Sequence, residues 1–151
     1  MTEKDLFEEF SRINEAKDVI TVFHNGKFDY QVLYCTCGIK MRIDWDTMIG
    51  AKLIDENERA GLKQQYIEKI DNSIQKYSID HLFDIEYAVV NPDVFALYAA
   101  TDAMMTYKLY LWQKDIMESK DYSRVYNLFN TIEMPLVTVI AELEMRGMVI
   151  D

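Results

Sequence analysis

The sequence predicts an α/β fold that is mostly helical and has a small, incomplete sheet. Most of the chain places apolar residues at the spacing of about 3.6 that is typical of helices, and only residues 18–23 and 40–45 have the composition of strands. The first of these strands runs directly into a helix at His24-Asn25-Gly26, a type of junction at which α/β folds place their chemistry. Because two strands are too few for a stable sheet, we expect part of the fold to lie outside this chain.

The composition indicates one domain with a sizeable core and an acidic surface. The 151 residues include 26 Asp and Glu against 16 Lys and Arg, a net charge of −10. A domain that binds nucleic acid tightly by itself is usually basic, because phosphate neutralisation dominates the affinity. Metal ions or a neighbouring domain must therefore supply positive charge if this chain meets DNA. No segment resembles a signal peptide or a membrane span, so we expect a cytoplasmic protein with no membrane partner.

The N-terminal half is expected to alternate helices and strands. The β-branched run at residues 18–23 suits a strand buried on both faces, and residues 40–45 alternate as in a half-exposed strand. Gly38 is placed to end the helix before the second strand, and Asp46 to cap the helix after it. The expected helices are residues 3–16, with the stripe Leu6, Phe7, Phe10 and Ile13, then residues 28–36, and residues 46–54, with Ile49, Ala51, Leu53 and Ile54 near the buried side.

The middle of the chain is expected to hold two more helices. The apolar positions of residues 62–70 fit a short amphipathic helix. Asn91 and Pro92 form a start signal, with the asparagine as cap and the proline in the first turn, and the helix that follows is expected to reach about Ser119. Its predicted buried stripe consists of Phe95, Tyr98, Ala99, Asp102, Met105, Leu109, Trp112 and Ile116.

A last helix is expected at residues 122–146. Pro135 should kink it or split it in two, because proline lacks a backbone N–H and its ring clashes with the preceding turn. Gly147 is placed to end this helix, and residues 148–150 have the composition of a strand. The side chains predicted to face inward are Val125, Leu128, Phe129, Ile132, Leu136, Val139, Ile140 and Leu143.

Two pairs of polar residues are candidates for a site. Asn25 and Asp29 lie one helical turn apart, and so do Tyr98 and Asp102, which allows each pair to point at one spot. Asp102 falls on an apolar stripe, where a carboxylate is costly unless it is paired or holds a metal. These residues, taken alone, are also compatible with purely structural roles. Asp102 is then a buried acid satisfied by an arginine or a backbone amide, Asp29 a first-turn acid favoured by the helix dipole, and Asn25 a helix cap.

The combination of motifs resembles a known family. Asn25-Gly26-Lys27-Phe28-Asp29 is similar to the second motif of the 3′→5′ exonucleases with four acidic metal ligands. Tyr98-Ala99-Ala100-Thr101-Asp102 is similar to their third motif, in the version with Tyr four residues before the final Asp. Trp45-Asp46-Thr47-Met48 resembles the connecting segment of this domain in bacterial family A DNA polymerases. Residues 130–137 and 144–151 resemble the junction at which those polymerases pass from the exonuclease domain to the polymerase domain.

The resemblance implies a partial ribonuclease H-like exonuclease fold, mostly helical, with the first strands of the sheet missing from this chain. Residues 1–130 would be the C-terminal portion of the exonuclease domain, and residues 131–151 a junction helix and strand leading into a polymerase domain. The implied reaction is the metal-dependent hydrolysis of 3′-terminal nucleotides, which is proofreading, in a DNA polymerase I-like protein of a bacterium or phage. The implied partners are a single-stranded DNA 3′ end and a polymerase domain in the same protein.

The resemblance also assigns roles to the candidate residues. Two divalent ions, Mg²⁺ or Mn²⁺, about 4 Å apart are used in this chemistry, and such hard cations take oxygen ligands. By resemblance, Asp29 and Asp102 each hold one ion, and Tyr98 orients the attacking water. Asn25 and Phe28 would contact the terminal nucleotide or its neighbours.

One family motif has no counterpart in the expected place. The first motif is an Asp and a Glu separated by one residue on a strand, and the Asp bridges both ions. Asp84-Ile85-Glu86 has the right letters, but it lies between the second and third motifs, and we interpret it as coincidence. We therefore expect this chain alone to be inactive, with its ion sites incomplete, and expect an upstream segment or a companion polypeptide to supply the motif.

Two other functions stay open at this stage. A degenerate exonuclease domain would act as a scaffold or a DNA-guiding module, although such decay usually removes the acids, and Asp29, Tyr98 and Asp102 are all present. An exoribonuclease of similar fold is the other alternative, and the polymerase-like junction at residues 132–151 argues against it.

Overall fold

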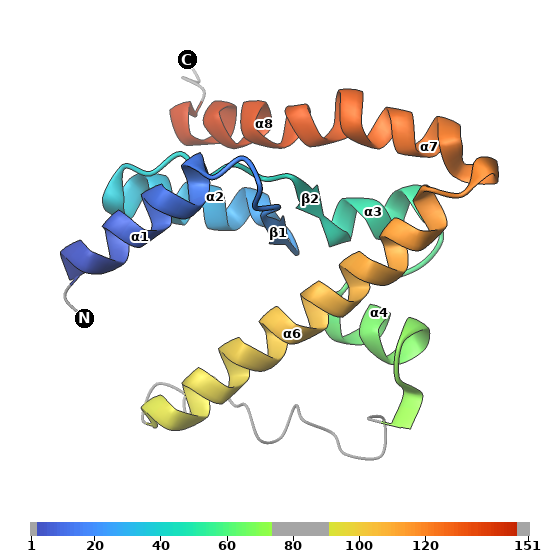
Figure 1. Cartoon of the computed structure of the whole chain (residues 1–151), viewed down its shortest axis with the longest axis horizontal. Helices are drawn as coiled ribbons and strands as arrows, with labels where there is room; N and C mark the ends of the chain where they lie inside the picture. The colour runs from blue at the N-terminus through green and yellow to red at the C-terminus, as the bar shows by residue number, and fades with distance from the viewer. Residues whose placement is uncertain (1–2, 74–90, 148–151) are drawn as a thin grey trace.

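The computed structural model describes residues 3–73 and 91–147. These residues are mostly helical with a small two-stranded sheet, as the sequence predicted (Figure 1). The predicted strand at residues 148–150 and the segment Asp84-Ile85-Glu86 lie outside the described residues. The elements are α1 (Glu3–Glu15), β1 (Val22–Phe23), α2 (Gly26–Cys37), β2 (Trp45–Asp46), α3 (Thr47–Ile54), α4 (Leu62–Lys69), α6 (Pro92–Met117), the 3₁₀ turn η3 (Lys120–Tyr122), α7 (Ser123–Leu128), the π turn η4 (Phe129–Glu133) and α8 (Met134–Arg146).

The elements are arranged in three layers (Figure 1). The run from α7 to α8 forms one side, the two strands with α2 and α3 lie in the middle, and α6 with α4 forms the other side. Helix α8 packs on α2, α6 packs on β1 and α3, and α4 packs on α6. None of the described helices is long and apolar enough to cross a membrane.

The two strands are parallel and pair in one register. Val22 lies opposite Trp45, and Phe23 lies opposite Asp46. Both strands therefore end at the same edge of the sheet, beside the turn that leads into α2. The register places the end of β2 next to the junction that the sequence singled out.

The strands are shorter than predicted, and one burial prediction is wrong. Val19 and Ile20 were expected inside a strand buried on both faces, but they are 39% and 54% exposed. Within the described residues, no strand covers the other edge of β1. Over the expected second strand, the amides of Asp44 and Trp45 donate to the carbonyl of Thr21. Side chains add further bonds: Arg42 donates to backbone carbonyls near the end of α1, and the Asp44 carboxylate accepts from Thr21.

The predicted helix signals are confirmed at three positions. The carboxylate of Asp46 accepts from the first amides of α3, and the side chain of Asn91 accepts from the first amides of α6. Gly38 ends α2, with its N–H donating to the carbonyl of Tyr34 over 3.0 Å. Cys35 and Cys37 are free thiols. Local capping chemistry was therefore readable from the sequence, because it depends only on near neighbours.

The predicted stripe of α1 is only half covered. Leu6 and Ile13 are 39% and 36% exposed, and Phe7 and Phe10 are half-buried. Asn14 attaches α1 to the segment before β2: its side chain donates to the carbonyl of residue 40 and accepts from the amide of residue 42.

Helix α6 buries more than the single stripe that was predicted. Met105 and Leu109 are buried as expected, but Phe95 is 56% exposed. A second buried stripe was missed, because α6 lies between α4 on one side and the strands with α3 on the other. This stripe consists of Thr106, Tyr110, Gln113 and Met117.

The last helical run is split in two, as Pro135 led us to expect. A π turn joins α7 to α8, and the N–H of Met134 donates to the carbonyl of Phe129 five residues back. Pro135 follows within the first turn of α8. The extra residue of the π turn directs Phe129 into the core, where its ring centroid lies 4.5 Å from that of Trp45.

The predicted inward face of this run is largely wrong. Leu136, Val139 and Leu143 are 41%, 58% and 62% exposed. The run is apolar on nearly all sides, so periodicity alone could not tell which stripe packs on the rest of the protein. The buried stripe is Phe129, Met134, Val137 and Ala141.

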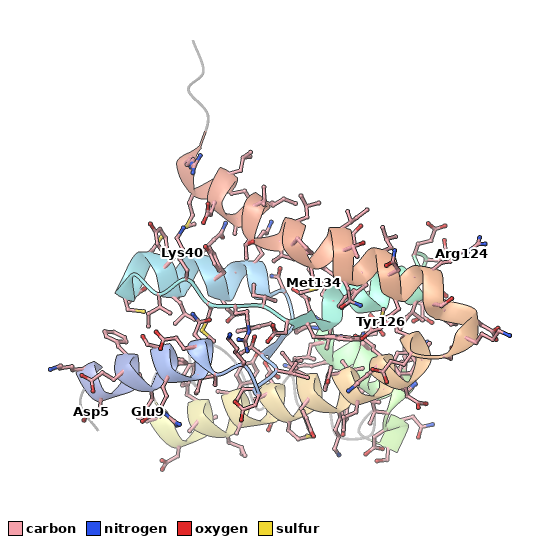
Figure 2. The ribbon with its side chains drawn as sticks, turned by 45° about the horizontal axis from the view of Figure 1, so that its top comes forward. Asp5, Glu9, Lys40, Arg124, Tyr126 and Met134 are labelled. Atoms are coloured by element: carbon pink, nitrogen blue, oxygen red, sulfur yellow. The ribbon has the colours of Figure 1, made fainter. Side chains whose placement is uncertain are left out.

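Helix α8 makes polar contacts with α2 and with the segment that follows α2, in addition to packing on α2. Lys27 pairs with Glu144 over 2.7 Å, and Lys40 pairs with Glu142 over 2.6 Å. Figure 2 shows Lys40 just below α8. The hydroxyl of Tyr30 also donates to Glu142, over 3.0 Å. These contacts hold the helix that carries Asp29.

Candidate active site

A pocket of about 820 Å³ lies between the end of β1, the start of α2 and the middle of α6. Asp29 reaches it from the first turn of α2, and Asp102 reaches it from α6. Asp18 and His24 also line it. Two carboxylates separated by 73 positions (102 − 29) thus share one acidic pocket at the carboxyl edge of the sheet.

The direction of Asp29 is set by a tight turn between β1 and α2. Asn25 has a left-handed backbone, with φ 63° and ψ 46°. Gly26 packs so closely on the strand that a β-carbon there would come within 2.7 Å of the Cβ atom of Phe23. The carboxylate of Asp46 accepts from the amides of Asn25 and Gly26, over 3.1 and 2.7 Å. The turn is therefore held from the end of the neighbouring strand.

A bound cation would stabilise the carboxylates of Asp29 and Asp102. Burial raises the pKa of the Asp29 carboxyl, a backbone hydrogen bond opposes the rise, and the charge of Asp46 adds to it. The Oδ1 atom of Asp102 is buried and has no hydrogen-bond partner within the described part of the chain. An unpaired buried carboxylate oxygen is costly, so this atom is ready to accept a ligand.

His24 belongs to the wall of the pocket. Its Nδ1 atom lies 2.9 Å from the Oγ1 atom of Thr47. Burial lowers the pKa of His24, and the charges of Asp46 and Asp102 partly oppose this. Burial therefore favours the neutral form of the ring.

The other predicted site residues are not among those that line this pocket. Tyr98 is one turn before Asp102 on α6, and the Nζ atom of Lys63 lies 4.9 Å from the centroid of its ring. Asn25 lines a smaller pocket of about 200 Å³ on the side of α8. Phe28 is 62% exposed. The roles predicted for these three residues stay predictions.

One positioning group was missed by the sequence analysis. Gln113 is fully buried on α6, and its Nε2 atom donates to the carbonyl of Thr47 over 2.8 Å. Its Oε1 atom accepts from the indole of Trp45 over 3.0 Å. These bonds fix α6, and with it Asp102, against the end of β2. The only sequence signal was an amide among the apolar residues of a helix.

The described residues do not by themselves form a metal site. They contain no group of three His, Cys, Asp or Glu side chains close enough to hold a metal ion together. The carboxylates of Asp29 and Asp102 are the ligand type that Mg²⁺ and Mn²⁺ prefer, and both line one pocket. The residues fit the predicted ions in chemistry, while further ligands would have to come from elsewhere.

A family model described as 3′-5′ exonuclease matches residues 1–116. The chain is also similar to three DNA polymerases. It is 28% identical to DNA polymerase I of Treponema pallidum over 151 residues, which cover 94% of this chain and 14% of that protein. It is 31% identical over 134 residues to DNA polymerase I of Chloroflexus aurantiacus, covering 85% and 14%. It is 32% identical over 154 residues to DNA polymerase DpoZ of Acinetobacter phage SH-Ab 15497, covering 91% and 23%.

The chain therefore belongs to the 3′-5′ exonuclease family found in DNA polymerase I-like proteins. The resemblance inferred from the motifs is confirmed at this level. The chain spans less than a quarter of the length of these relatives. No solved structure matches it at a significant level.

Proposed function

We propose that this chain contributes to the removal of 3′-terminal nucleotides from DNA, as part of the exonuclease domain of a DNA polymerase I-like protein. The observation that carries the proposal is the meeting of Asp29 and Asp102 in one pocket. The family match supports an exonuclease, and the ribonuclease H-like fold and the division into residues 1–130 and 131–151 are part of the same proposal.

The charge of the pocket supports a reaction that depends on cations. Asp18, Asp29 and Asp102 line it, and the whole chain carries a net charge of −10. A phosphodiester would be repelled from such a pocket unless positive ions neutralised it. Divalent ions, when bound, would activate water and offset the charge that grows on the phosphate.

Each residue has a proposed part in this reaction. Asp29 and Asp102 would hold Mg²⁺ or Mn²⁺, with the buried Oδ1 atom of Asp102 as one ligand. Tyr98, one turn before Asp102, would orient the attacking water by a hydrogen bond. Asn25 and Phe28 would contact the terminal nucleotides, and the 62% exposure of the Phe28 side chain leaves it accessible to a base.

Within the described residues, one edge of β1 pairs with no strand. This free edge is a place at which a segment from outside these residues could pair. Ile20 is 54% exposed and lines the pocket, and a strand placed beside it would bring its own side chains to the two acids. We propose that a segment with the Asp-x-Glu motif pairs at this edge, either from upstream in the same protein or from a companion polypeptide. The purified chain would then be inactive by itself.

The test uses single-stranded DNA labelled at its 3′ end, with Mg²⁺ or Mn²⁺ present. We expect no release of nucleotides by the purified chain, and release once a polypeptide with the Asp-x-Glu motif is added. Asp102→Ala should abolish the restored activity, and Asp115→Ala, on the exposed side of α6, should leave it unchanged.

Three outcomes would contradict the proposal. Hydrolysis by the chain alone that is lost in Asp102→Ala would show that the site is complete without a partner segment. No hydrolysis with any Asp-x-Glu partner would favour a non-catalytic scaffold. Release from a matched RNA strand and not from DNA would favour an exoribonuclease.

A further inference from the structure

We propose that Asp46 is a positioning residue of the site: its carboxylate holds the left-handed turn at Asn25 and so sets the direction in which α2 presents Asp29. The inference rests on the proposed function only for the use that is made of Asp29. The geometry of the turn can be tested without any hydrolysis.

A single buried carboxylate joins two helix starts. Asp46 is 1% exposed. Its Oδ2 atom accepts from the amide of Gly26 over 2.7 Å, and its Oδ1 atom accepts from the amide of Asn25 over 3.1 Å. Oδ1 also accepts from Met48 over 2.9 Å and from Ile49 over 3.4 Å. The acid therefore pairs amides at the start of α2 with amides at the start of α3.

The turn at Asn25 needs such support. A positive φ is uncommon for a residue with a β-carbon, and Asn25 is the one described non-glycine residue that has it. The side chain of Asn25 makes no capping hydrogen bond to α2. The backbone amides of the turn are instead bound by Asp46, from a strand that follows 20 residues later.

The charge of Asp46 suits this place, and an amide would not replace it. Both helix starts carry partial positive charge, which favours an anion. In Asp46→Asn, one carboxylate oxygen would become an NH₂ group, and this group cannot accept a hydrogen bond from the amide of Gly26. A buried amide left without a partner is unfavourable, so the turn should open locally.

The first measurement is amide hydrogen exchange by NMR on the purified chain. In Asp46→Asn we expect the amide of Gly26 to exchange at least about tenfold faster, since the oxygen that accepts from it becomes an NH₂ group. The matched control is Asp44→Asn, because Asp44 also accepts from a backbone amide next to β1, that of Thr21, over 2.8 Å. It should speed exchange at Thr21 and leave Gly26 unchanged.

The second measurement separates the turn from the capping of α3. Asn25→Gly lets residue 25 adopt a positive φ without strain. If Asp46 holds this turn, the loss of stability caused by Asp46→Asn should be several-fold smaller in the Asn25→Gly background, as a change in the unfolding equilibrium constant. A role limited to the amides of Met48 and Ile49 would give the same loss in both backgrounds.

The outcomes decide the proposal in either direction. Unchanged exchange at Gly26, or equal losses in the two backgrounds, would overturn it. If Asp46→Asn alone does not fold, recovery of the fold in the double variant supports the proposal, and failure of the double variant counts against it. A chain that passes these tests but never gains hydrolysis would contradict the proposed function and leave the role of Asp46 in place.

Discussion

The side-chain amide of Gln113 lies against the backbone of Gly50, so that a β-carbon on residue 50 would come within 2.9 Å of the Gln113 Cδ atom. The contact joins α6 to α3 at a buried position. It requires glycine for space, and it leaves the amide free to bond Trp45 and Thr47.

We expect Gly50→Ala to destabilise the chain by about 1–3 kcal/mol, because the added methyl group overpacks a closed contact. Urea denaturation followed by circular dichroism measures this change. The control is Gly61→Ala, since a β-carbon at residue 61 meets nothing within 4 Å; because Gly61 is the N-cap of α4, it should cost about 0.5–1 kcal/mol. Equal effects for the two variants would show that the contact with Gln113 can relax.

Gln113→Ala should cost about 2–4 kcal/mol, because it leaves the indole N–H of Trp45 and the carbonyl of Thr47 without their partner in a buried place. Gln64→Ala is the control, since Gln64 makes a bond to Glu68 one turn away on the exposed surface of α4, and it should change stability by about 0.5 kcal/mol or less. The same unfolding assay compares the two. A small effect at Gln113 would mean that water or another group replaces its hydrogen bonds.

Phe129→Ala should cost about 3–5 kcal/mol, the usual range for removing a buried aromatic ring. Phe129 is fully buried in the π turn and packs on Trp45. Its neighbour Leu128 is 36% exposed, and Leu128→Ala should cost about 1 kcal/mol. Thermal unfolding distinguishes them, and a larger loss at Leu128 would show that the other stripe of this run is the one that packs.

His24 should make the stability of the chain depend on pH. Its pKa is lowered in the folded state from the ordinary 6.5, so the unfolded chain takes up the proton first as the pH falls. The stabilising contribution is present above pH 6.5 and is lost as the pH falls towards the lower folded value. Unfolding midpoints measured at several pH values between about 5 and 8 test this.

The matched variant for this prediction is His24→Gln, which removes the titrating ring. We expect it to flatten the dependence in this range. An equal slope in wild type and His24→Gln would show that other groups cause the dependence. Because Asp46 and Asp102 oppose the lowering, Asp102→Asn should steepen the loss.

Features that depend on neighbouring residues were predicted correctly from the sequence, and features that depend on packing were not. The caps at Asp46 and Asn91 and the helix end at Gly38 were predicted correctly, since each depends on residues within one turn. The stripes of α6 and α8 were predicted poorly, since a helix that is apolar on several sides has no single buried face in its own sequence. Leu136 and Leu143 were expected inside and are exposed, because the neighbouring stripe of Val137 and Ala141 packs on the protein.

The candidate site divides in the same way. The sequence by itself determined the family, and it identified Asp29 and Asp102 as candidate metal ligands, because short motifs keep their spacing and their order. Only the tertiary structure decided that these acids share a pocket, that Asp46 binds the turn before Asp29, and that Gln113 fixes the helix of Asp102. The reason is physical: hydrogen bonds between residues 20 to 70 positions apart, such as those of Asp46 and Gln113, depend on how the elements pack, and no local pattern records them.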